Sequence, residues 1–259
     1  MAVKGEAVGC NRRITQWFAA GVLSAAALSL VASISLRSVF AGGRDRVPSY
    51  VEWTPQTTAA ASAGDAFRGS LLAKRCEHCH GDEGFSQTAA TPNLAGMDKL
   101  AVWKQLQDFR SGSRSSRVMN PIAQSLAARD VADLVAYYSR LPVFADFQDN
   151  RAFPEARPDD GHISMASRLI KFGDGDRGIP PCDACHGPIA YRPGVPSLMT
   201  QNADYVVDQL QAFAMGKRAN DINEPMRTIA GLLTEEERHA LAEYYGAGLG
   251  MQGTSSISK

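Results

Sequence analysis

The chain has 259 residues, of which 44% are apolar and 21% are charged. This composition is typical of a folded globular protein and excludes a collagen-like, wholly disordered or multi-span membrane protein. The 27 basic residues balance the 27 acidic ones, and this neutrality argues against a general role in nucleic-acid binding. A chain of this length accommodates one large domain or two small ones.

The first 41 residues have the pattern of an export segment. Arg12 and Arg13 precede an apolar stretch, Trp17–Leu36, that contains no charged residue. Basic residues before such a stretch stay on the cytoplasmic side, so the remainder is predicted to be translocated. Val39-Phe40-Ala41 resembles a signal-peptide cleavage site, but 20 apolar residues are also long enough to span a bilayer. A signal peptide and a membrane anchor over residues 17–36 both remain open.

Changes in composition divide the rest of the chain. Residues 42–64 are rich in small residues and proline, which predicts a flexible tether without a core of its own. Residues 143–160 follow Pro142 and combine prolines with mixed charges, as a linker does. We therefore expect a first domain at 65–142, a second domain at 161–248 and a tail at 249–259.

An internal repeat decides the predicted architecture. Cys76-Glu77-His78-Cys79-His80 recurs as Cys182-Asp183-Ala184-Cys185-His186, at an offset of 106 residues. Other matches recur at offsets of 104 to 107: Pro92 with Pro196, Gln105-Leu106 with Gln209-Leu210, Phe109 with Phe213, Met119 with Met226, and Tyr137-Tyr138 with Tyr244-Tyr245. Two copies predict two domains of roughly 80 residues, each small for a purely apolar core. A covalently held cofactor would supply the missing apolar centre.

Apolar residues recur at helical spacing in both copies, without strand-like alternation of useful length. The matching stripes are Val102, Leu106 and Phe109 in the first copy and Val206, Leu210 and Phe213 in the second. Thr234 and Glu237 predict a capping box at the last helix of the second copy. The first copy has Ala127 in place of Thr234, so its last helix is predicted to lack that cap. The predicted fold is all-α.

The pattern C-x-x-C-H is the attachment signature of a c-type haem. Two thiols three residues apart on the first turn of a helix can each add to one vinyl group of the same porphyrin. The adjacent histidine then lies under the iron. We expect two covalent haem c groups, held by Cys76 and Cys79 and by Cys182 and Cys185, with His80 and His186 as proximal ligands.

Other uses of these cysteines are less consistent with the sequence. Structural disulfides would leave both following histidines unexplained. A thioredoxin-like redox motif needs a βαβ setting, which the pattern does not provide. A zinc site built from both cysteine pairs suits a cytosolic protein and conflicts with the predicted export.

The sixth iron ligand is predicted from the repeat. Met119 lies 39 residues after the first haem-motif histidine, and Met226 lies 40 residues after the second. A thioether ligand raises the haem potential and suits electron transfer. A single methionine is more often core filler, but these two occupy matching positions. Met165, Met199 and Met215 have no such counterparts.

Three arginines flank Met119 in the sequence: Arg110, Arg114 and Arg117. Such a run is most often a solvated face. Because it lies beside a predicted iron ligand, it also suggests a docking rim near the first haem, where charge would steer a partner.

These residues resemble the di-haem class I cytochromes c of the cytochrome c4 type, over about residues 64–248. The likeness includes both haem motifs, Pro92-Asn93-Leu94-Ala95-Gly96, Pro196 and both methionines. It implies two cytochrome c folds related by a pseudo-two-fold axis, with haem propionate edges facing each other. It also implies that the carbonyls of Pro92 and Pro196 accept hydrogen bonds from the proximal histidines. The second copy lacks the Leu-Ala-Gly of the first, which leaves the wall of its haem pocket open.

The resemblance also implies a function, that of an electron carrier in the periplasm. Expected partners are redox proteins such as a quinol–cytochrome c reductase, a terminal oxidase or a periplasmic dehydrogenase. Two irons with both axial ligands in place offer no substrate position, so an enzyme is not expected. A cytochrome subunit of a periplasmic dehydrogenase complex is an alternative, and a di-haem peroxidase is a less favoured one. The carrier would be soluble after signal cleavage or tethered to the inner membrane through residues 17–36.

Overall fold

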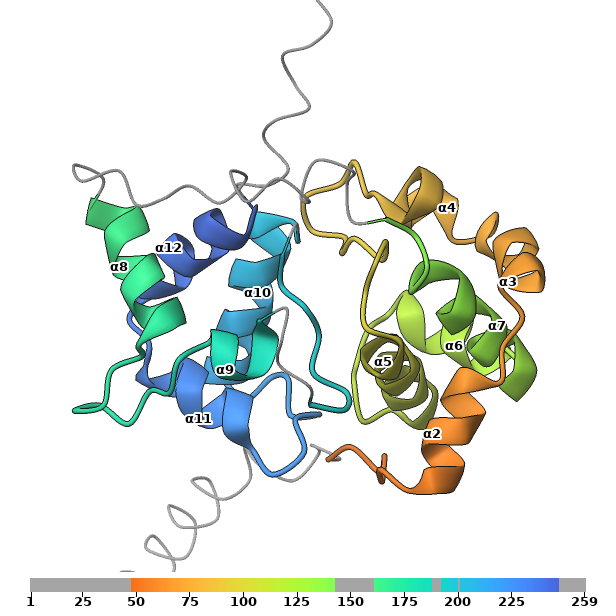
Figure 1. Ribbon diagram of the computed structural model, residues 1–259, viewed down its shortest axis with the longest axis horizontal. Coiled ribbons are helices and arrows are strands. Elements are labelled where there is room, and N and C mark those ends of the chain that lie inside the picture. Colours follow the sequence, from red (N-terminus) through yellow and green to blue (C-terminus); the bar gives the residue numbers. More distant parts are fainter. Residues whose placement is uncertain (1–47, 143–160, 188–191, 200, 247–259) are drawn as a thin grey trace, which may run out of the picture. The chain divides into compact units, whose positions relative to one another are not determined.

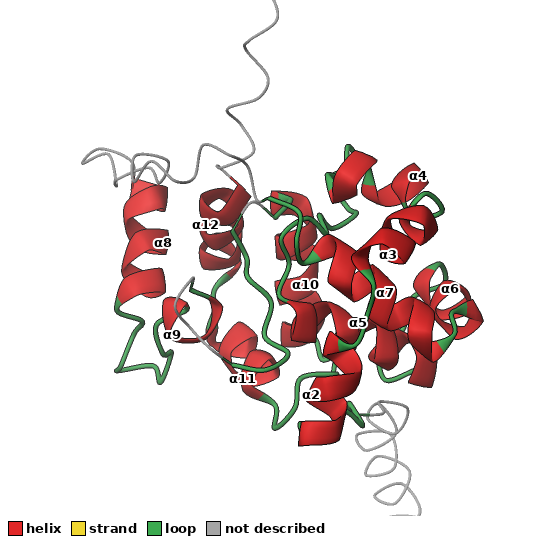
Figure 2. Ribbon diagram, turned by 45° about the vertical axis from the view of Figure 1, so that its right-hand side comes forward, coloured by secondary structure: helices red, strands yellow, loops and turns green. Residues whose placement is uncertain are grey.

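The structure is a computed structural model that describes residues 48–142, 161–187, 192–199 and 201–246. Within these ranges the regular elements are helices, and the β structure is a single isolated bridge between Asp174 and Ile179. Figure 2 shows this helical content. The all-α prediction is confirmed. The predicted export segment, linker and tail lie outside the described residues. None of the described helices is long and apolar enough to cross a bilayer.

The first copy builds one group of helices (Figure 1). Its elements are α2 (Pro55–Ser62), α3 (Ala66–Ala73), α4 (Glu77–His80), the 3₁₀ helix η1 (Asp82–Gly84), α5 (Lys99–Ser111), α6 (Met119–Ser125) and α7 (Ala128–Tyr138). Helices α3 and α5 pack on α7, and α6 packs on α5. The core is centred on the apolar face of α7, where Val131 and Val135 are fully buried.

The second copy builds a second group, whose described helices follow the order of α3 to α7, without counterparts of α2 and η1. They are α8 (Gly161–Lys171), α9 (Asp183–His186), α10 (Ala203–Ala214), α11 (Pro225–Leu232) and α12 (Glu235–Gly246). Helices α8 and α10 pack on α12, and α11 packs on α10, as α3, α5, α7 and α6 do in the first copy. The repeat in the sequence is therefore a repeat of helix packing.

Side-chain caps set where several helices begin. Thr234 Oγ1 accepts a hydrogen bond from the Glu237 N–H, and the Glu237 carboxylate accepts one from the Thr234 N–H. The predicted capping box of α12 is confirmed. At α7 the Asp130 carboxylate accepts from the Ala127 N–H, but the alanine side chain has no acceptor to offer in return. Half of the box remains in the first copy.

The prediction of a flexible tether over residues 42–64 is wrong for the described part, 48–64. Helix α2 lies inside it, capped by Thr54, and packs against α5 and α7 with Ala61 buried. Ser113 Oγ donates to the Pro48 carbonyl at 2.8 Å, which fastens the segment before α2. We call residues 48–62 the strap. The sequence pattern did not predict an ordered strap, because the strap lacks the apolar stripe by which a packed helix is recognised. Caps and hydrogen bonds hold it in place instead.

Candidate haem sites

The first haem motif lies on and just before α4. Cys76 is the N-cap residue of this short helix, and Cys79 and His80 are part of it. His80 is buried, and its Nδ1 lies 2.9 Å from the Pro92 carbonyl oxygen. A carbonyl only accepts, so Nδ1 carries the ring proton and Nε2 keeps its lone pair. Burial lowers the pKa of His80, which favours the neutral ring that binds iron.

The second haem motif repeats this geometry on α9. Cys182 precedes the helix, and Cys185 and His186 are part of it. The Nδ1 atom of His186 lies 2.8 Å from the Pro196 carbonyl oxygen, and burial lowers the pKa of the ring. The hydrogen bonds to the two prolines that the family resemblance implied are therefore present in both copies. Each leaves Nε2 free to bind a metal.

The four motif cysteines are free thiols in the structure, so no disulfide joins them. Burial raises the pKa of Cys76, and it raises that of Cys182 to about 11. Beside them are two tyrosines at matching positions, Tyr138 and Tyr245. Their hydroxyls are buried and form no hydrogen bond within the described residues. In both copies, free thiols thus lie next to a buried hydroxyl that has no hydrogen-bond partner in the part of the chain that the structure describes. This arrangement fits the attachment of a large prosthetic group at each pair of cysteines.

The two predicted sixth ligands occupy equivalent helix starts. Met119 is the first residue of α6, and Met226 is the second residue of α11, after Pro225. Both are partly buried, and Met226 packs against the second core. Met215 is 52% exposed at the end of α10, a position that does not suit an iron ligand. Met165 and Met199 pack against the second core without counterparts in the first.

The interpretation of the arginine run as a solvated face or docking rim is wrong for Arg114. Its guanidinium donates to Gln105 of its own copy at 2.7 Å and to Gln209 of the other copy at 2.8 Å. Arg218 does the same in reverse, donating to Gln209 at 2.9 Å and to Gln105 at 3.1 Å. Arg114 and Arg218 are 104 residues apart, the offset of the two glutamines. This shared offset is the feature of the sequence that could have identified Arg114 and Arg218 as a matching pair.

The two arginines also stack on the aromatic ring of their own copy. Arg114 lies 4.7 Å from the ring centroid of Phe109, and Arg218 lies 4.4 Å from that of Phe213. A cation over an aromatic face is attracted to it, and the planar guanidinium loses little freedom there. The reciprocal pairing is what a pseudo-two-fold relation between the copies requires, since each copy offers the same residues to the other.

This interface is electropositive. Within the described residues, neither Arg114 nor Arg218 forms an ion pair with a carboxylate. Burial and then the charge of Arg114 lower the pKa of Arg218 to about 9. These two partly buried cations, held by neutral amides, still have N–H donors to offer. Such a donor set suits the carboxylates of a haem, whose propionates are anionic. The residues present therefore fit two haem groups.

These features define the class of protein: a di-haem c-type cytochrome, with one C-x-x-C-H motif on each of two matching helical domains. No model of a protein family matches the chain. The chain is 35% identical over 191 residues to cytochrome c4 of Thiocapsa roseopersicina, covering 72% of this chain and 94% of that protein. It is 37% identical over 185 residues to the thiosulfate dehydrogenase electron acceptor of Stutzerimonas stutzeri (strain A1501), covering 70% and 82%.

Comparison with solved structures leads to the same family. Reduced recombinant cytochrome c4 from Pseudomonas stutzeri superposes with a TM-score of 0.61 at 30% identity, covering 71% of this chain and 98% of that one. The chain belongs to the cytochrome c4 family. It is an electron-transfer protein of two tandem cytochrome c domains and carries two covalently bound haem c groups.

Proposed function

We propose that each haem is held by the two cysteines of its C-x-x-C-H motif and that its iron is bound by one histidine and one methionine. The thioether links come from Cys76 and Cys79 in the first domain and from Cys182 and Cys185 in the second. The iron ligands are His80 and Met119 in the first domain and His186 and Met226 in the second. The matched hydrogen bonds from the histidine Nδ1 atoms to proline carbonyls are the observation that supports this assignment most strongly.

The proposed domains follow the repeat. The first comprises residues 65–142, with the strap packed on it, and the second comprises residues 161–248. Residues 143–160 link them, 1–41 form the export segment, and 249–259 form the tail. Arg12 and Arg13 before the apolar stretch support a location in the periplasm. Sequencing the N-terminus of the mature protein tests whether residues 17–36 are removed as a signal peptide or retained as an anchor.

The geometry explains how these residues serve electron transfer. The bound haem supplies an iron that takes up and releases one electron at a time. The proline carbonyls hold the imidazole rings in one orientation and one tautomer. Burial lowers the pKa of both rings and so favours their neutral form, and Met119 and Met226 would supply the second protein ligand to each iron. The hydrogen-bonded interface joins the domains, so that an electron can enter one and leave through the other.

The electron donor in this proposal is a periplasmic dehydrogenase. One relative, 37% identical, is named as the electron acceptor of thiosulfate dehydrogenase. We propose the same kind of partner for this chain, with a terminal oxidase or another respiratory protein as acceptor. Mixing the oxidised protein with thiosulfate dehydrogenase and thiosulfate should reduce both haems within the turnover time of the enzyme. No reduction beyond that by thiosulfate alone would remove this donor from the proposal.

A spectroelectrochemical titration of the holo protein tests the ligand assignment. Two one-electron transitions are expected, each with the ferric charge-transfer band of a methionine–iron bond. Met119→His and Met226→His should each lower the potential of one transition and leave the other in place, because imidazole does not raise the potential as a thioether does. A variant that leaves both transitions unchanged would show that its methionine is not a ligand.

A further inference from the structure

Asp108 of α5 is a fully buried carboxylate that receives donors from three parts of the chain. Ser49 of the strap donates to Oδ1 at 2.6 Å, and Lys104, one turn earlier on α5, donates to Oδ2 at 2.5 Å. Asn220 of the second domain donates to the same Oδ2 through its amide, at 2.6 Å. The carboxylate thus joins the strap, the first domain and the second domain at one point.

Lys104 also binds the backbone of Asn220. Its Nζ donates to the Asn220 carbonyl at 2.5 Å, and both residues are almost fully buried. Asn220 is therefore fixed at two atoms, its side-chain amide and its main-chain oxygen, by a buried ion pair of the other domain. Removing one member of such a pair leaves the other group buried without a partner, which is costly.

The loop that contains Asn220 leads to Met226. The next residue, Asp221, accepts from the backbone N–H of Arg227 at 2.9 Å and from its Nε at 2.7 Å. Arg227 directly follows Met226. Between them, Asn223 and Glu224 have φ angles of 63° and 64°, a left-handed conformation that asparagine adopts readily but that is uncommon for glutamate. Asn220 and Met226 are thus joined through a short loop that the Asp221–Arg227 hydrogen bonds close.

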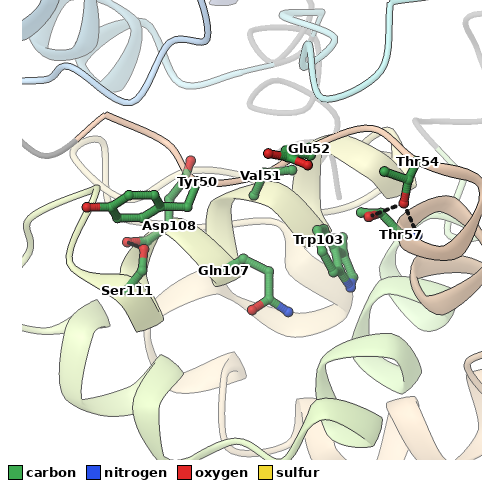
Figure 3. Close-up of a pocket in the computed structure, with 9 residues that line it drawn as sticks. All are labelled: Tyr50, Val51, Glu52, Thr54, Thr57, Trp103, Gln107, Asp108 and Ser111. Atoms are coloured by element: carbon green, nitrogen blue, oxygen red, sulfur yellow. Dashed lines mark hydrogen bonds between the residues drawn. The ribbon is translucent and has the colours of Figure 1, made fainter.

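The strap lies over this network. Figure 3 shows Tyr50 and Val51 of the strap facing Trp103, Gln107 and Asp108 of α5. These residues line part of a cavity of about 390 Å³. Farther along the strap, Trp53 packs on Gly194 of the second domain, where an added Cβ would come within 2.4 Å of the ring.

A second cavity, of about 570 Å³, lies between the start of the strap and the Met226 loop. Its lining residues are Pro48, Ser49, Asp221, Ile222, Asn223, Glu224 and Arg227. The strap thus borders both α5 and the loop that leads to Met226.

The arrangement is one-sided. At the positions of Lys104 and Asp108, the second domain has Asp208 and Ala212, at an offset of 104 residues. The loop before Met119 is instead held within its own domain by Asn120, whose amide donates to the Phe109 carbonyl at 2.6 Å and to the Arg114 carbonyl at 2.9 Å. Arg114 of that loop also donates to Tyr205 and Gln209 of the second domain, both at 2.8 Å. What is one-sided is the buried ion pair, because the second domain has no lysine and aspartate at the positions of Lys104 and Asp108.

We propose that Asp108 and Lys104 are positioning residues for the sixth ligand of the second haem, acting across the domain interface through Asn220. The inference rests on the assignment of Met226 as that ligand. It makes the second haem dependent on a buried ion pair of the first domain, whereas the matching positions of the second domain, Asp208 and Ala212, offer no such pair to the first haem. The coupling element is a chain of hydrogen bonds that both domains share.

The test measures how readily imidazole displaces methionine from each ferric iron of the full-length holo protein. Met119→His leaves only the second iron with a displaceable methionine, and Met226→His leaves only the first. In the Met119→His background, Asp108→Ala and Lys104→Met should each increase imidazole affinity about tenfold, the effect of losing one buried hydrogen bond. In the Met226→His background, neither change should alter it. Asp208→Ala, at an exposed position of α10, is the charge control and should have no effect.

The two main variants separate positioning from charge. They remove opposite charges, so a through-space effect would shift imidazole affinity in opposite directions, whereas lost positioning shifts it in the same direction. Opposite shifts, equal shifts at both irons, or no shift at the second iron would each overturn the inference. Lys104→Met keeps the volume of the side chain, which keeps the test usable if Asp108→Ala does not fold. Absence of a displaceable methionine at the second iron before any change would instead refute the ligand assignment.

Discussion

Gly69 of α3 should not tolerate a side chain, because the backbone of α7 lies directly against it. It is buried where α3 crosses α7, and a Cβ built on it would lie 2.0 Å from the backbone oxygen of Asp133 and 2.7 Å from the Cβ of Tyr137. Ala66–Ala73 is an ordinary helix, so alanine itself would favour helix formation by about 0.8–1 kcal/mol over glycine. The obstacle is main chain, which cannot rotate away, so the helices must separate.

The expected net effect of Gly69→Ala is a loss of stability of about 1–2 kcal/mol. This value is an overpacking cost of about 2–3 kcal/mol minus the gain in helix propensity. The overpacking cost is taken at the upper end of the usual range because the clash is with backbone. Because α3 leads directly into Cys76, the loss should fall on the first domain. Guanidinium chloride unfolding of the holo protein, followed by far-ultraviolet circular dichroism and by the haem absorption, measures it.

Gly231 provides a matched control in the second domain. It lies in α11, and a Cβ built on it meets no atom within 4 Å. Gly231→Ala should therefore raise stability by about 0.5–1 kcal/mol through helix propensity and reduced freedom of the unfolded chain. If Gly69→Ala proved as stabilising as Gly231→Ala, the close approach of α3 and α7 would be refuted.

Three further predictions concern charges and caps. Hydrogen bonds from Arg68 lower the pKa of Asp133 despite its burial, so its contribution to stability is present above the unfolded pKa, near 4, and is lost as pH falls through the folded value. Acid unfolding of Asp133→Asn should accordingly depend less on pH below about 4 than that of the wild type, and an unchanged acid profile would contradict this. Thr234→Ala should cost about 1 kcal/mol and Ala127→Thr should stabilise by a similar amount, as thermal unfolding can measure; equal melting temperatures would refute the capping argument. Arg218→Leu should lower the haem potentials seen in a redox titration, because a partly buried cation at the interface disfavours the more positive ferric state; higher potentials would contradict this.

Much of the site could be predicted because its chemistry is local. Both thiols and the proximal histidine of each motif lie within five residues, so a single helical turn brings them together whatever the rest of the chain does. The repeat also predicted Met119 and Met226 as iron ligands, since a methionine that recurs at matching positions in two copies is unlike an ordinary core residue. The proline hydrogen bonds came from the family resemblance and span only 12 and 10 residues.

The interface could not be predicted in this way. Arg114 and Gln209 are 95 residues apart, and Lys104 bonds to the main chain of Asn220 across 116 residues. Neither contact leaves a periodic pattern, and a main-chain acceptor has no residue type to recognise. The arginine beside Met119 therefore resembled a solvated charge until the second domain was in place.

The sequence by itself determined the haem motifs, the helical repeat and the matching methionines, because these depend on spacing along one helix or on comparison of the chain with itself. Only the tertiary structure decided that the strap is ordered and that the first domain supports the Met226 loop. Those features depend on polar and charged residues whose hydrogen bonds form only when distant segments meet. Their stability comes from pairing in a buried interface, and the residues show no preference for it on their own.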